Sequence, residues 1–164
     1  MRGNVLPLQP LILVIRRLKK QGKRIAFTNG CFDLLHIGHL SCLERIKAQA
    51  DILVVAVNTD ASVRRLKGRG RPLVPARERA RLVAALKPVD WVILFSELTP
   101  IKLIRALRPD LLAKGGDWTP ERIVGREVVE SYGGRVLEIP TVAGRSTTRL
   151  VEQMGKAVHP TGSP

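Results

Sequence analysis

The chain has 164 residues and a formal net charge of +14, because 28 Lys and Arg face 14 Asp and Glu. This length suits one domain with its own core, and an apolar share of 45% excludes a wholly disordered chain. The positive charge favours anionic partners such as nucleic acid, a membrane surface or phosphorylated small molecules. An aromatic share of 4% counts against a base-stacking surface for single strands. We therefore expect a small anionic ligand.

The sequence gives no sign of secretion. Cys31 and Cys42 could form one disulfide at most, which excludes a disulfide-rich scaffold. The apolar stretch 5–15 contains two prolines and is too short to span a bilayer. The strong basic cluster of Arg16, Arg17, Lys19 and Lys20 follows this stretch instead of preceding it, which is the reverse of a signal peptide. We expect a cytoplasmic protein without a membrane partner.

Helical and strand-like segments alternate along the chain. A helix is predicted first, and continuous apolar runs typical of buried parallel strands follow at intervals. The predicted strands are residues 24–28, 52–57, 91–95, 111–113 and 135–139, and the predicted helices are residues 11–20, 38–49, 77–86, 100–107, 120–132 and 146–154. The alternation predicts an α/β fold, a Rossmann-like open parallel sheet of about five strands with helices on both faces. Ligands of such sheets bind beyond the carboxyl ends of the strands.

The same pattern predicts how the chain is organised. Residues 1–23 are expected to form an N-terminal helical extension, and residues 24–155 the α/β domain. Residues 156–164, which contain Pro160, Gly162 and Pro164, are expected to form a flexible tail.

The end of the first predicted strand carries the strongest functional signal. Residues 28–39 read Thr-Asn-Gly-Cys-Phe-Asp-Leu-Leu-His-Ile-Gly-His and lead into a helix. Gly30 permits a sharp turn or a close approach to a ligand. His36 and His39 are three residues apart at the helix start, so both can point at one spot. Free amides and the helix dipole favour an anion there, and imidazole donors would bind a phosphate more strongly as its charge grows.

The residues alone leave three other interpretations of this segment. The histidines could be ordinary surface residues, since short motifs are hypotheses. A structural zinc site could use Cys31, His36, His39 and Cys42, although the spacing differs from that of known zinc knuckles. Cys31 could also act as a nucleophile with a histidine base, but nothing in the sequence distinguishes a reactive thiol from a small packing residue.

Residues 30–39 resemble the signature of the nucleotidyltransferase superfamily, in which His-x-Gly-His follows a Gly-x-Phe-Asp turn. In that superfamily the two histidines bind the nucleoside triphosphate and stabilise the pentacoordinate α-phosphorus. Residues 28–39, 57–72 and 108–148 resemble more narrowly the adenylyltransferase domain of ADP-heptose synthesis, which activates D-glycero-β-D-manno-heptose 1-phosphate for lipopolysaccharide or surface-glycan assembly. Many bacteria fuse this domain behind a sugar kinase domain. No segment of that size precedes Arg24, so we expect a stand-alone form.

The resemblance implies a role for each matched position. Catalysis is implied for His36, His39 and Lys67. Lys67 belongs to a basic stretch at residues 61–71, which the residues themselves predict as a loop that could fold over phosphates, although a solvated charge run explains most of its basic residues better. Nucleotide binding is implied for Thr28, Asn29, Gly30, Cys31, Phe32, His36, His39, Arg79, Gly115, Asp117, Ser146, Thr147 and Thr148. Substrate binding is implied for Asp33, Arg65, Lys67 and Trp118. Ser146 would serve equally well as a helix N-cap, and Arg145 stands where the superfamily commonly has Ile.

The expected reaction joins ATP and a sugar 1-phosphate into an ADP-sugar with release of pyrophosphate. Such phosphoryl chemistry needs positioning and charge stabilisation more than a protein nucleophile. Mg²⁺ should accompany ATP and keep several waters, so no protein ligand to the metal is expected. We also expect a homo-oligomer, a dimer or higher. One alternative is a cytidylyltransferase acting on glycerol 3-phosphate or a similar alcohol phosphate, which shares the short motifs. Another is a basic nucleic-acid-binding protein, although few aromatics and scattered basic residues count against a nucleic-acid partner.

Overall fold

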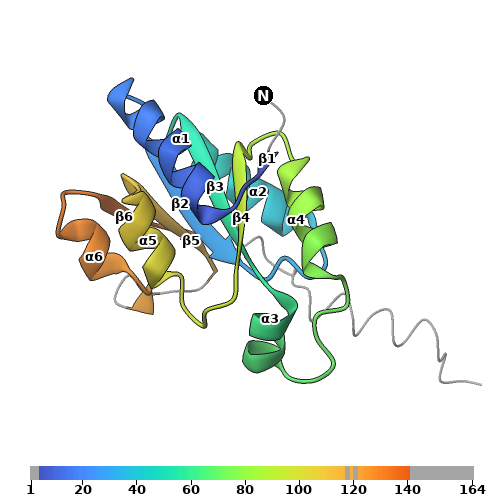
Figure 1. Ribbon diagram of the computed structural model, residues 1–164. Helices are drawn as coiled ribbons and strands as arrows, with labels where there is room; N and C mark the ends of the chain where they lie inside the picture. Colours follow the sequence, from blue (N-terminus) through green and yellow to red (C-terminus); the bar gives the residue numbers. More distant parts are fainter. Residues whose placement is uncertain (1–3, 117–118, 120–121, 141–164) are drawn as a thin grey trace, which may run out of the picture.

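The computed structural model describes residues 4–116, 119 and 122–140 of the chain. Within this part of the chain, one sheet has the strand order β1-β4-β3-β2-β5-β6 (Figure 1). Its strands are β1 (Asn4–Val5), β2 (Ile25–Gly30), β3 (Ile52–Asn58), β4 (Trp91–Phe95), β5 (Leu111–Gly115) and β6 (Arg135–Ile139). Every neighbouring pair is parallel. The predicted α/β class with an open parallel sheet is confirmed.

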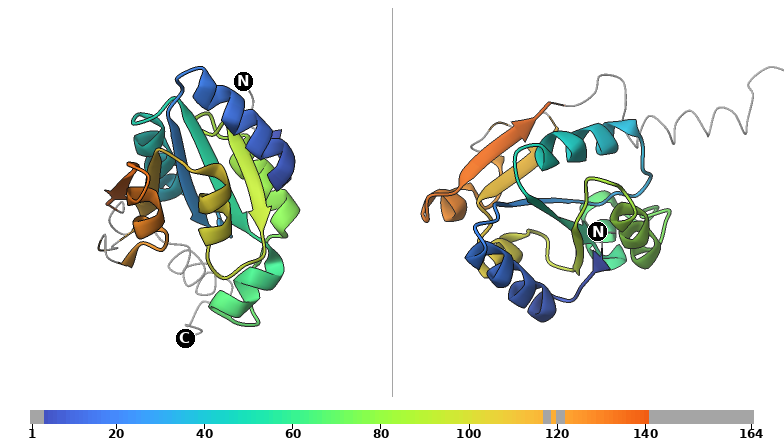
Figure 2. Two further views of the ribbon diagram at one scale, coloured as in Figure 1. Left: turned by 60° about the vertical axis from the view of Figure 1, so that its left-hand side comes forward. Right: turned by 90° about the horizontal axis from the view of Figure 1, so that it is seen from above.

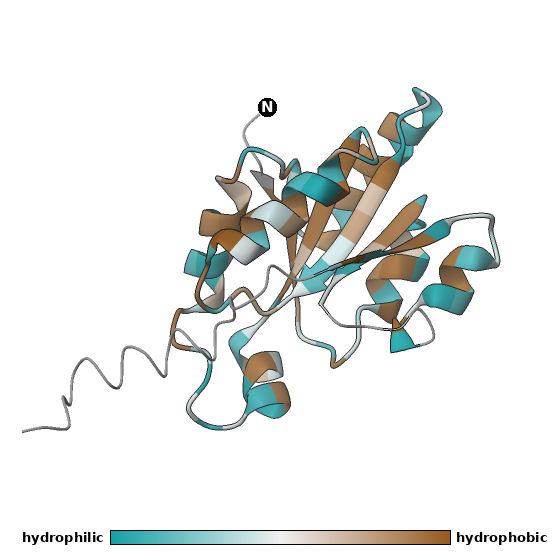
Figure 3. Ribbon diagram, turned by 180° about the vertical axis from the view of Figure 1, so that it is seen from behind, coloured by the Kyte–Doolittle hydropathy of each residue, from teal (hydrophilic) through white to brown (hydrophobic). Residues whose placement is uncertain are grey.

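Both faces of the sheet are covered, which explains why its strands read as unbroken apolar runs. All seven residues of β3 are buried. Alternate residues of this strand enter different cores, because successive side chains of a strand point to opposite faces. Leu53, Val55 and Val57 belong to one cluster, whereas Ile52, Val54 and Ala56 belong to the other. Figure 3 shows the apolar colour running along the central strands.

The helices divide between the two faces (Figure 2). On one face lie α1 (Leu8–Lys20), α5 (Ile101–Leu107) and α6 (Arg126–Glu130), which contribute Leu11, Ile104 and Val129 to one core. On the other lie α2 (Ile37–Lys47) and α4 (Ala76–Ala84), which contribute Leu43 and Val83. The remaining helix, α3 (Asp60–Lys67), follows β3 and lies beyond the carboxyl end of the sheet.

The five predicted strands are all present, and β4 and β6 have the predicted bounds. The sheet has one strand more than predicted, because the two residues of β1 pair with Trp91 and Val92 of β4. A strand this short has no periodicity that sequence could reveal. The helix predicted over residues 11–20 begins earlier, at Leu8, and its Leu11 and Ile15 pack against the sheet.

The loop predicted at residues 61–71 is wrong, because most of this basic stretch forms helix α3. Thr59 caps this helix by accepting a hydrogen bond from the Ser62 amide at 3.5 Å. Ser62 and Val63 are buried, so the basic side chains occupy the solvent face. The helix ends at Gly68, whose φ of 92° suits a residue without a side chain.

The helix predicted over residues 120–132 is shorter within the described residues, because α6 begins only at Arg126. Gly125 precedes it with a φ of 98°, a left-handed conformation that a continuous helix would not allow. The helix predicted over residues 146–154 lies outside the described residues. Among the described helices, none has the length and apolar character needed to cross a bilayer.

Candidate active site

A cavity of about 710 Å³ opens at the carboxyl ends of the strands. Its walls come from the end of β2 and the turn that follows, the start of α2, the end of α3, and the segments after β4 and β5. In the sheet order, β2 stands between β3 and β5, so the strand order reverses beside it. Ligands of open α/β sheets bind at such a switch point. The cavity therefore lies at the place where open parallel sheets bind their ligands.

His36 and His39 line the cavity and together cap helix α2. The Gly38 amide donates a hydrogen bond to Nδ1 of His36 at 3.1 Å, and the His36 amide donates to Nδ1 of His39 at 3.4 Å. The ring centroids of His36 and His39 are 3.9 Å apart. Because Nδ1 accepts in each ring, the proton of a neutral imidazole lies on Nε2. Both rings thus have the tautomer that can donate from Nε2.

The surroundings of His39 keep its ring neutral near neutral pH. Burial, assisted by the positive charges of His36 and Lys67, lowers the pKa of His39 from 6.5 to about 4. The ring also lies against Phe32, with centroids 5.2 Å apart. A neutral imidazole can still donate one hydrogen bond to an anion, through its single N–H group.

The described lining of the cavity is cationic. Lys67, Lys114 and Arg122 line it, together with the two histidines, whereas no Asp or Glu is present among the described lining residues. Low-dielectric walls of one sign concentrate the field and attract ligands of the opposite sign. One wall is apolar, because Leu66, Leu98 and Val124 also line the cavity. Apolar walls with a few convergent polar groups are typical of small-molecule sites.

Most of the residues predicted around the first strand are brought together here. Thr28, Asn29, Gly30, Cys31, Phe32, Lys67 and Gly115 all line the cavity with His36 and His39. A side chain at Gly115 would require Cys42 to shift, because an added Cβ would lie 2.5 Å from Sγ of Cys42. Asp117, Trp118, Ser146, Thr147 and Thr148 lie outside the described residues.

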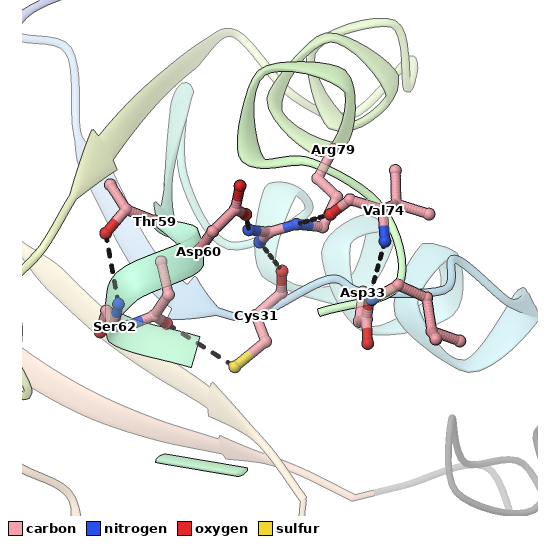
Figure 4. A network of polar contacts seen from close by, with 9 residues as sticks. Cys31, Asp33, Thr59, Asp60, Ser62, Val74 and Arg79 are labelled. Atoms are coloured by element: carbon pink, nitrogen blue, oxygen red, sulfur yellow. Dashed lines mark hydrogen bonds and ion pairs between the residues drawn. The ribbon is translucent and has the colours of Figure 1, made fainter. Parts of the chain in front are cut away.

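Arg79 does not reach the cavity. Its side chain is 0% exposed and donates to the carbonyl oxygen of Val74 at 2.7 Å, to the carbonyl oxygen of Cys31, and to the carboxylate of Asp60 at 2.7 Å (Figure 4). The guanidinium therefore joins the turn after β2 to the starts of α3 and α4. In this structure Arg79 supports the wall of the site and is not among the residues that line the cavity.

Asp33 is also turned away from the cavity. It is 3% exposed and accepts hydrogen bonds from Nη1 of Arg71 at 2.8 Å and from the amides of Leu73 at 2.7 Å and Val74 at 3.1 Å. Burial raises the pKa of Asp33, but the hydrogen bonds and the charge of Arg71 outweigh it, so the net pKa is lowered. In this structure Asp33 holds the segment after α3 through these three hydrogen bonds.

Arg65, the remaining predicted substrate residue, does not line the cavity either. Its guanidinium donates to the Ser96 carbonyl oxygen and links α3 to the segment after β4. Cys31, His36, His39 and Cys42 do not form a zinc site, since the described residues contain no group of three or more potential metal ligands.

Sequence reasoning missed Asn58, Lys114 and Arg122 as residues that line the cavity. Asn58 and Lys114 stand at the carboxyl ends of β3 and β5, and this position was the available signal. Asn58 is buried and donates from Nδ2 to Oγ of Ser62 at 2.9 Å. Arg122 lies between β5 and α6, and no pattern in the sequence singled it out.

The fold is that of an α/β nucleotidyltransferase, and comparison with known families agrees. Residues 27–152 match the model of a family described as cytidylyltransferase-like, so the chain belongs to this family.

Curated relatives cover most of this chain. Bifunctional protein HldE of Geotalea uraniireducens is 54% identical over 147 residues, which are 90% of this chain and 30% of that protein. The proteins of the same name from Pelobacter propionicus and Koribacter versatilis are 56% and 49% identical, over 88% and 93% of this chain. The chain spans about three tenths of the length of these relatives.

Solved structures share the fold. The lipopolysaccharide core biosynthesis protein of Thermoplasma volcanium has a TM-score of 0.64 and 28% identity, over 74% of this chain and 99% of that one. Pantoate-beta-alanine ligase of Francisella tularensis has a TM-score of 0.62 at 15% identity, over 89% of this chain and 69% of that one. The second likeness concerns the fold alone.

Proposed function

We propose that the chain transfers AMP from ATP to a heptose 1-phosphate, giving ADP-heptose and pyrophosphate for lipopolysaccharide or surface-glycan synthesis. One observation carries this proposal. The His36–His39 pair caps a helix inside a cavity whose described lining holds cations and no carboxylate. Such a site attracts a polyphosphate and offers donors to it.

In the proposed reaction an oxygen of the sugar phosphate attacks the α-phosphorus of ATP in line. The bond to the pyrophosphate oxygen breaks on the opposite side, and no covalent enzyme intermediate forms. The residues therefore position the reactants and stabilise charge. His36 and His39 would donate from Nε2 to the α-phosphate oxygens, and these hydrogen bonds strengthen as charge grows in the transition state. The neutral ring of His39 serves this role without a proton transfer.

Lys67 and Arg122 would bind the remaining phosphate charge, since both line the cavity at its outer wall. Mg²⁺ is proposed to enter as part of the nucleotide complex and to neutralise the pyrophosphate leaving group. The described lining has no carboxylate to hold the ion, so its ligands would be phosphate oxygens and water.

The choice of ATP and heptose 1-phosphate rests on the relatives. The motifs resemble the adenylyltransferase domain of ADP-heptose synthesis, and relatives about 54% identical are named bifunctional. The match covers only about three tenths of their length, which agrees with this chain corresponding to one domain of those longer proteins. The second candidate is a cytidylyltransferase acting on glycerol 3-phosphate, because the matching family is described as cytidylyltransferase-like.

Pyrophosphate release tests both candidates in one experiment. The purified chain is incubated with Mg²⁺ and either ATP or CTP, and with heptose 1-phosphate of each anomer, glucose 1-phosphate or glycerol 3-phosphate. We expect release with ATP and the β-anomer of heptose 1-phosphate. Release with CTP and glycerol 3-phosphate alone would replace the proposal by the second candidate. No release with any pair, together with salt-sensitive binding to duplex DNA, would favour a nucleic-acid-binding protein.

A further inference from the structure

Lys114 and Asn29 meet at the point where the strand order reverses. Asn29 lies near the end of β2 and Lys114 near the end of the adjacent strand β5. The Lys114 ammonium donates to the carbonyl oxygen of Asn29 at 3.0 Å and to its Oδ1 at 3.3 Å. Both residues line the cavity. The pair thus joins the two strands at the centre of the proposed nucleotide site.

The position of Lys114 is not one that folding alone favours. Burial lowers the pKa of its ammonium, because desolvation disfavours the charged form. Lysines with a desolvated ammonium cost free energy in the folded state, and an apolar residue of similar shape is often as stable or more so. The lysine is therefore better explained by its hydrogen bonds to Asn29 than by a contribution to stability.

The contact also fixes the orientation of the Asn29 amide. Oδ1 of Asn29 accepts from Lys114, so the amide is oriented by this hydrogen bond and its Nδ2 group is the donor half of the side chain. Because Asn29 lines the cavity, a fixed Nδ2 can donate to a phosphate or ribose oxygen of a bound nucleotide. Without Lys114 the amide could rotate and present its acceptor oxygen to the same anion.

We propose that Lys114 is a positioning residue for nucleotide binding, which acts by holding the side-chain amide of Asn29 with its donor group toward the ligand. This inference rests on the proposed function, because it assumes a nucleotide in the cavity. It assigns a role to a residue at the end of β5 that the histidine motif does not include.

A double-mutant cycle tests the inference with Mg²⁺ and the non-hydrolysable analogue α,β-methylene-ATP. Lys114→Met, Asn29→Ala and the double variant are compared with the wild type by calorimetric titration. Each single change should weaken analogue binding by roughly tenfold, the scale of a lost hydrogen bond to a charged group. The double variant should bind no more weakly than the weaker single variant, because Lys114 acts through Asn29.

Two further variants separate positioning from structural support. Lys87→Met changes an exposed lysine after α4 and should bind the analogue as the wild type does. Lys114→Arg keeps a charged donor near Asn29 and should restore most of the affinity, which keeps the inference testable if Lys114→Met does not fold. The melting temperature of a folded Lys114→Met should stay within a few degrees of the wild type, and its KM for ATP should rise while kcat changes little.

Two results would overturn the inference while leaving the proposed function intact. One is wild-type affinity in a folded Lys114→Met, and the other is independent, additive losses in the cycle. A wild-type chain that binds no analogue at all would instead contradict the proposed function itself.

Discussion

The amide of His36 donates a hydrogen bond to Nδ1 of His39, and the ring of His36 in turn accepts one from the Gly38 amide, so both histidine rings cap the start of α2. The residues that would stabilise the transition state are thus also the residues that begin α2. This coupling explains how the imidazoles are oriented before a ligand arrives, since helix formation itself fixes both rings. It also means that capping and chemistry must be separated in any test by mutation.

Replacing His39 in two ways separates them. Gln at the third helical position is a usual capping-box residue, so His39→Gln should keep the melting temperature near that of the wild type. His39→Ala removes the acceptor and should lower it. Both variants should lose roughly 100-fold or more in turnover, the scale of one lost transition-state donor. Turnover measured by pyrophosphate release checks this, and near-normal turnover in His39→Gln would remove His39 from the mechanism.

Stability should depend on pH through His39. Its pKa of about 4 in the folded chain lies below the ordinary histidine value of 6.5, so between these pH values the unfolded chain binds more protons. The free energy of unfolding attributable to His39 is therefore fully present above about pH 6.5 and falls as the pH is lowered toward 4. Thermal melts across this range should show a shallower decline for His39→Gln than for the wild type. Parallel curves for the two proteins would contradict the lowered pKa.

Arg79 should prove structural. Arg79→Met leaves Asp60 and two carbonyl oxygens without their donor and should lower the free energy of unfolding by about 2–4 kcal/mol in chemical denaturation. Arg81→Met, an exposed change on the same helix, is the matched control and should have little effect. A stable Arg79→Met that has lost only nucleotide affinity would restore the direct phosphate contact predicted from sequence.

We expect Cys42 to be the reason why position 115 needs a glycine. Gly115→Ala brings a Cβ within 2.5 Å of Sγ of Cys42 and should destabilise the fold by about 1–3 kcal/mol. The double variant with Cys42→Ala removes the sulfur and leaves the Cβ of residue 42 at 3.6 Å, an ordinary contact. Chemical denaturation should show most of the loss recovered in the double variant. No recovery would mean that Gly115 is required for another reason.

Much of the fold follows from patterns that are local in the sequence. The apolar runs of β3 and β4 fix buried parallel strands, because only a sheet covered on both faces accepts them. Helix α3 was missed because its basic face and following glycines resemble a solvated loop, and only Ser62 and Val63 face inward. β1 was missed because two residues carry no period and depend on β4 for pairing.

The candidate site also contains residues that the sequence alone brings together and residues that only the fold brings together. The turn and the His36–His39 pair belong to one continuous segment, so the sequence alone brings them together. Lys114 and Asn58 join them only through strand register, which a single sequence does not reveal. Arg79 and Asp33 carry the right charge or polarity for ligands, and only their burial shows that backbone and side-chain partners already occupy them.

Nitrogen-15 NMR of the histidine rings can show whether His36 and His39 bind the nucleotide through Nε2. With Mg²⁺ and α,β-methylene-ATP added near neutral pH, we expect both rings to keep their proton on Nε2 and both Nε2–H signals to shift as the nucleotide binds. Signals that stay unchanged at saturating nucleotide, or rings protonated at Nδ1 instead, would mean that the two histidines do not receive the triphosphate in this way.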